Sequence, residues 1–124
     1  MEILVGIVLI GIFVAFFRVL KKTSIVKKVF KQFSLSIING DTDNRIIDMA
    51  KANHYAIGGF VAEFMYYAEE IIEEEIEDQG LEINNFRYDM EFEIKDAKEA
   101  IEKALIKRFK VLNVRVDESG ICSI

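Results

Sequence analysis

Residues 3–17 read ILVGIVLIGIFVAFF, fifteen uncharged residues near the start of this 124-residue chain. If Arg18 snorkels, the two apolar residues after it extend the run to roughly 27 Å of helix, close to a bilayer core of about 30 Å. A cleavable signal peptide is disfavoured, because an acid precedes the run and Arg18 follows it in place of small residues. The run therefore predicts an uncleaved single transmembrane helix over residues 1–22, with a core helix of a soluble protein as the alternative.

A block of basic side chains borders this apolar run. Residues 18–31 contain no acid and six basic residues, namely Arg18, Lys21, Lys22, Lys27, Lys28 and Lys31. Because only residues 1 and 2 lie on the other side, the positive-inside rule predicts a cell-membrane protein with its N-terminus outside and residues 23–124 in the cytoplasm. We expect the six basic side chains to contact the lipid bilayer through its anionic headgroups.

The composition limits the other classes of partner and site. The net charge is −5, so the chain lacks the global basic character of a nucleic-acid-binding protein, and we expect no nucleic acid as a partner. The single Cys122 cannot form a disulfide within the chain, and one Cys with one His falls short of a structural zinc site. The absence of proline favours long helices.

Apolar residues at helical spacing predict helices at about 24–38, 43–57 and 60–79. Asn39 and the glycine after it favour a helix end, and the pair Gly58-Gly59 favours a break between the second and third helices. The helix at 24–38 has a basic side, so it either packs into the domain core or lies along the membrane surface.

The C-terminal part of the chain predicts a strand–helix–strand unit. Residues 86–94 read FRYDMEFEI and alternate between apolar and charged side chains, which predicts a half-buried strand over 86–95. A capping pattern then begins a helix over 96–109, and alternation returns in predicted strands at 111–117 and 121–124. The expected fold class is α+β: the transmembrane helix, then a small domain whose sheet is covered on one face by helices.

An acidic run at residues 69–78, EEIIEEEIED, contradicts the local rules for a helix end. Acids near a helix C-terminus oppose the helix dipole at about 0.3–1 kcal/mol each, and acids three or four residues apart repel one another. Such conflicts mark candidate functional sites, with a merely solvated face as the alternative. The predicted partner-binding residues are Glu69, Glu70, Glu73, Glu74, Glu77 and Asp78. We expect them to meet a protein partner with a basic surface or the chain's own Lys27, Lys28 and Lys31.

No motif indicates a reaction. His54 has no Ser, Cys or carboxylate three or four residues away, and Asp41-Thr42-Asp43 lacks the later Gly and Glu of a calcium loop. The sequence predicts no catalytic, cofactor or metal residues. It favours a membrane-anchored, non-enzymatic interaction module on the cytoplasmic face, such as an accessory subunit, an adaptor or an immunity-type protein. The alternative is a small membrane-associated enzyme that uses carboxylates with a divalent metal.

Overall fold

Helices account for 75% of the residues in the computed structural model. The backbone is described for residues 2–81 and 89–124, and the side chains for residue 12 and for residues 20–81 and 89–124. The helices described are α1 (Glu2–Ile38), α2 (Asp43–Lys51), α3 (Ile57–Asp78) and α5 (Glu91–Leu112). Strands β1 (Arg115–Val116) and β2 (Cys122–Ser123) pair antiparallel in a two-stranded sheet.

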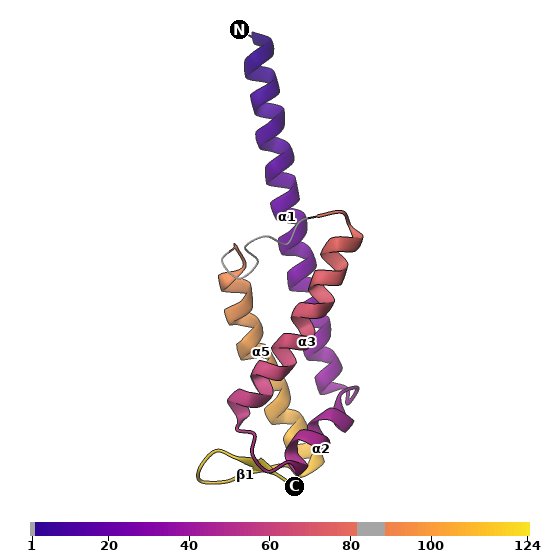
Figure 1. Ribbon diagram of the computed structural model, residues 1–124, viewed down its shortest axis with the longest axis vertical. Helices are drawn as coiled ribbons and strands as arrows, with labels where there is room; N and C mark the ends of the chain where they lie inside the picture. The colour runs from indigo at the N-terminus through magenta and orange to yellow at the C-terminus, as the bar shows by residue number, and fades with distance from the viewer. Residues whose placement is uncertain (1, 82–88) are drawn as a thin grey trace.

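The C-terminal half of α1 forms a three-helix bundle with α3 and α5 (Figure 1). In this bundle α1 and α5 run in the same direction, and α3, which lies between them in the sequence, runs in the opposite direction. Helix α2 and the β1–β2 hairpin close the lower end of the bundle, whereas the N-terminal half of α1 extends beyond the upper end. Helix α5 therefore packs against both α1 and α3.

Apolar residues spaced three or four apart on each helix make the core, because that spacing places them on one side of a helix. The buried members on α1 are Val26, Val29, Phe30 and Ile37. Those on α3 are Phe60, Phe64, Met65, Ala68, Ile72 and Ile76, and those on α5 are Ala97, Ile101, Ala104, Leu105 and Phe109. Phe60 and Phe109 meet edge-on with ring centroids 5.0 Å apart. Burial of each large side chain contributes about 1.5–3 kcal/mol to folding.

The predicted α+β fold class is wrong, because residues 91–95 begin helix α5 and do not form a strand. Met90 and Ile94 are four residues apart, a spacing that suits one side of a helix as well as one face of a strand. In the structure Met90 is buried and continues the stripe of Ala97 and Ile101, whereas Phe92 points outward and is 78% exposed. Phe86 and Tyr88, which also supported the strand, lie outside the described residues.

The strands predicted at 111–117 and 121–124 shrink to two residues each. Helix α5 continues to Leu112, beyond its predicted end at residue 109, because the apolar stripe does not stop there. Asn113 then adopts the left-handed conformation with φ of 59°, and the backbone N–H of the next residue donates a hydrogen bond to the Phe109 carbonyl oxygen. Asn tolerates this conformation better than most residues, which explains the helix end at this position.

The transmembrane prediction also requires correction. Within the described part of the chain, no helix is long and apolar enough to cross a membrane. The single-pass helix over residues 1–22 and the predicted localisation, N-terminus outside and the domain cytoplasmic, are therefore wrong. The uncharged run covers fifteen residues, about 22 Å of helix, and depended on Arg18 to approach the required length. The side chains of residues 3–11 and 13–17 lie outside the described residues, and the α1 backbone continues unbroken into the bundle.

Candidate functional site

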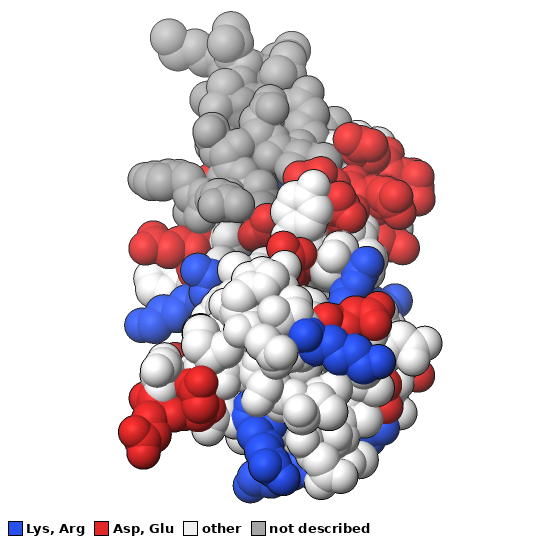
Figure 2. Space-filling model, turned by 60° about the horizontal axis from the view of Figure 1, so that its bottom comes forward, with Lys and Arg blue, Asp and Glu red and all other residues white. Residues whose placement is uncertain are grey.

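The predicted acidic residues lie on the C-terminal half of α3, on the side that faces away from the core. We call Glu69, Glu70, Glu73, Glu74, Glu77 and Asp78 the acidic face. All of them are exposed except Glu69, which is half-buried. Ile72 and Ile76, which lie between them in sequence, are 0% and 1% exposed. Figure 2 shows acidic side chains gathered at the upper right, where α3 ends. The helix thus separates an apolar side that anchors it from an acidic side that faces solvent.

Tyr66 extends the acidic face by one helical turn. Its side chain is 58% exposed, and a hydrogen bond with Glu70 raises the pKa of the Tyr66 hydroxyl, with smaller contributions from the charges of Glu70, Glu73 and Glu63. The direction of the shift follows from the negative charges, because they disfavour a phenolate. Tyr66 therefore stays a neutral hydrogen-bond donor beside the carboxylates.

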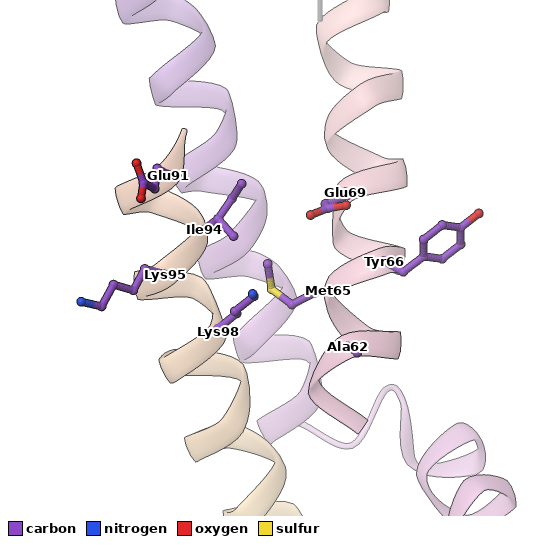
Figure 3. Close-up of a pocket in the computed structure, with 8 residues that line it drawn as sticks. All are labelled: Ala62, Met65, Tyr66, Glu69, Glu91, Ile94, Lys95 and Lys98. Carbon is purple, nitrogen blue, oxygen red and sulfur yellow. The ribbon is translucent and has the colours of Figure 1, made fainter. Parts of the chain in front are cut away.

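A groove of about 460 Å³ lies beside the acidic face, between α3 and α5. We call it the α3–α5 groove. It is lined by Ala62, Met65, Tyr66 and Glu69 from α3 and by Glu91, Ile94, Lys95 and Lys98 from α5. In Figure 3, Met65, Ile94, Glu69 and Lys98 point into the space between the two helices, whereas Tyr66 and Lys95 point away from it. Glu69 belongs to both features, so the groove and the acidic face form one continuous surface.

The six basic residues at 18–31 do not gather against the acidic face. Lys21, Lys27, Lys28 and Lys31 are exposed and Lys22 is half-buried, while the side chain of Arg18 lies outside the described residues. Lys27 and Lys31 line a second groove, between α1 and α5, together with Glu93 and Asp96. No residue of the acidic face is among the described residues that line this second groove with Lys27 and Lys31. Their binding to lipid headgroups stays a prediction.

Arg108 and Asp43 join the last turns of α5 to the start of α2. Arg108 donates two hydrogen bonds to the Asp43 carboxylate, from Nε to Oδ1 at 2.7 Å and from Nη2 to Oδ2 at 2.6 Å. Hydrogen bonding from Arg108, aided by its charge, lowers the pKa of Asp43. The same pair raises the pKa of Arg108. The two side chains are about one-fifth exposed, 20% for Arg108 and 23% for Asp43. This pair joins α5 to α2 at the lower end of the bundle, and the charges of Arg108 and Asp43 satisfy each other.

His54 and Cys122, the chain's one imidazole and one thiol, differ in exposure. His54 is exposed, lies against Tyr55 with ring centroids 4.1 Å apart, and has Nδ1 3.2 Å from the Ala52 carbonyl oxygen. Cys122 is fully buried, and burial, followed by the charge of Asp117, raises the pKa of its thiol. Among the described residues, no three or more His, Cys, Asp or Glu side chains are grouped so as to hold a metal ion.

Comparison with known proteins adds no assignment: no protein-family model, curated protein or solved structure matches this chain.

Sequence reasoning located the acidic face but missed both grooves. Lys95 and Lys98 were assigned to a strand and a helix without a partner element, so their place opposite α3 could not be seen. The available signal was the three-four spacing of Ile94, Ala97 and Ile101, which indicates a helix one turn longer at its start.

Proposed function

We propose that this chain is a non-enzymatic interaction module that binds a protein partner with a basic surface through the acidic face of α3. The observation that carries the proposal is the exposure of Glu70, Glu73, Glu74, Glu77 and Asp78 along a helix whose opposite side is fully buried. These carboxylates are not needed to hold α3 in the bundle, because Ile72 and Ile76 already do so.

Unfavourable electrostatic interactions within the acidic face favour this proposal. α3 has no basic residue in its last turn, so each acid there opposes the helix dipole by about 0.3–1 kcal/mol. Lys or Arg side chains of a partner would relieve both the dipole conflict and the repulsion between neighbouring carboxylates. Clustered charges of one sign also speed encounters with an oppositely charged partner, and salt weakens this attraction.

The α3–α5 groove supplies apolar contacts to the proposed binding surface, beside the charged residues that also line it. Met65 and Ile94 point into it, and Tyr66 stands at its edge with 58% of its surface exposed. Tyr is enriched among the residues that contribute most to binding at protein interfaces. The surface suits an amphipathic helix whose apolar side enters the groove while its basic side meets the acidic face.

The proposal is tested with two labelled amphipathic peptides of equal length, one built from Leu and Lys and the other from Leu and Glu. Fluorescence anisotropy with the full chain should detect binding of the Leu/Lys peptide and none of the Leu/Glu peptide. The variant E70Q/E73Q/E77Q should bind about tenfold more weakly, because three exposed ion pairs at 0.2–1 kcal/mol each together contribute about 1.5 kcal/mol.

The control variant E99Q/E102Q removes two exposed acids from the outer side of α5, away from both grooves. Its affinity for the Leu/Lys peptide should equal that of the wild type. A control loss about two-thirds as large in free energy, in proportion to the two charges removed against three, would show that only net charge matters. An unchanged affinity of E70Q/E73Q/E77Q would refute the acidic face as the binding surface.

A further inference from the structure

A second groove, of about 360 Å³, lies between α1 and α5 on the opposite side of α5 from the acidic face. We call it the α1–α5 groove. Its floor is apolar: Phe30 and Ala97 are buried at its base, and Leu35 is 48% exposed at its side. Ser34 also lines the groove, and its hydroxyl oxygen is buried beneath the surface without a hydrogen-bond partner among the described residues. Leu35 thus leaves apolar surface at the side of the groove open to a partner.

The two edges of the α1–α5 groove carry opposite charges. Lys27 and Lys31 form the α1 edge, and Glu93 and Asp96 form the α5 edge. In the described part of the chain none of these four side chains forms an ion pair, although all four belong to one groove. The groove separates the charges, so each edge is available to an opposite charge from outside.

We propose that a second copy of this chain covers the α1–α5 groove, in a symmetric dimer whose two-fold axis runs parallel to the helices. Rotation about such an axis places the basic edge of one copy opposite the acidic edge of the other, at both edges of the interface. A two-fold axis across the helices would instead place Lys27 and Lys31 against the same residues of the second copy. The charge pattern therefore selects parallel packing of the two copies, since like charges facing one another disfavour the alternative.

The exposed residues of α1 support the same packing. Ile12 and Leu20 are 61% and 49% exposed. Together with Lys27 and Ser34 they are spaced by seven or eight residues, about two helical turns, so they share one side of the helix. In a parallel dimer this side of α1 faces the second copy both within the bundle and beyond its upper end. The interface would thus bury apolar surface that the single bundle leaves open.

The test uses charge reversal and sedimentation equilibrium of the full chain. The wild type should be a dimer. The variants K27E/K31E and E93K/D96K each give two groove edges of like charge, so each should dimerise at least tenfold more weakly. An equimolar mixture of the two variants should recover wild-type affinity as a heterodimer, and the quadruple variant K27E/K31E/E93K/D96K should recover it as a homodimer.

The matched control is K21E/K28E, which makes the same change of charge at two exposed lysines that do not line the α1–α5 groove. It should dimerise like the wild type, and circular dichroism should give every variant the wild-type helix content. A monomeric wild type would overturn the proposal, including the case in which a different protein covers the groove. Failure of the mixture to recover dimer would overturn the parallel arrangement. Neither outcome bears on peptide binding at the acidic face, which lies on another side of the bundle.

Discussion

The ion pair between Arg108 and Asp43 should stabilise the fold by about 1–2 kcal/mol, more than an ordinary surface pair. Opposite charges about 4 Å apart attract by about 4 kcal/mol at an effective dielectric constant of 20. Desolvation and the ordering of a long Arg side chain offset about half of that attraction. The two short, parallel hydrogen bonds at 2.6 and 2.7 Å place this pair with the stronger charge-assisted type.

A double-mutant cycle measures this coupling. Urea unfolding followed by circular dichroism gives the free energy of unfolding of the wild type, of Asp43→Asn, of Arg108→Ala and of the double variant at pH 7. The cycle cancels the separate effect of Asp43 on the dipole at the start of α2, where it is the acid of the first turn. A parallel cycle of Asp43→Asn with Lys110→Ala, an exposed cation two residues further on, should give coupling near zero. Coupling below about 0.3 kcal/mol for the first pair would refute the estimate.

The same coupling should depend on pH with a defined sign. In the folded state, Arg108 lowers the pKa of Asp43 below the ordinary value of 3.8. A lowered folded-state pKa stabilises the fold above the unfolded-state pKa, and the stabilisation is lost as the pH falls through the folded-state pKa. The coupling should therefore be constant from neutral pH down to about pH 4 and then decline. A decline that begins near neutral pH would point to a different group.

Two further substitutions test the bundle itself by urea unfolding. Ile72→Ala should lower the free energy of unfolding by about 2–5 kcal/mol, because the side chain is fully buried between the helices. Glu73→Ala, at the exposed neighbouring position, should change it by less than about 0.5 kcal/mol. Similar losses in both variants would contradict the assigned orientation of α3. Asn113→Gly should leave stability within a few tenths of a kcal/mol and Asn113→Val should lower it by about 1–2 kcal/mol, since φ is 59° there; a harmless Val would mean that α5 does not end in this conformation.

The parts of the fold that could be predicted are those with a long and unambiguous period. The stripe of Phe60, Phe64, Ala68 and Ile72 continues over several helical turns, and all of these residues are buried on α3. The start of α5 could not be assigned, because Met90 and Ile94 are spaced to suit a helix and a strand alike. Only the packing of α5 against α1 separates the two, since it buries Met90 and leaves Phe92 exposed.

The grooves were beyond prediction for a different reason. The acidic face is contiguous in sequence, so its position on one helix follows from spacing alone. The α1–α5 groove joins Lys27 and Lys31 to Glu93 and Asp96, more than sixty residues later in the chain. Its two edges lie opposite each other because α1 and α5 run in the same direction. No local sequence pattern encodes that relative direction. The fifteen-residue apolar run led to the wrong prediction of a transmembrane helix for another reason. The run is clearly apolar, but its length is marginal for crossing a bilayer.

The continuity of α1 has a mechanical consequence. The helix extends from Glu2 to Ile38, 37 residues without a proline, which corresponds to a rod about 55 Å long. A hinge within α1 would let its two halves move independently. A continuous hydrogen-bonded helix couples the two halves, so a rotation of the part before Leu20 also turns the part that carries Lys27 and Lys31. The orientation of the upper part of α1 is thereby coupled to the direction in which the lower part presents Lys27 and Lys31.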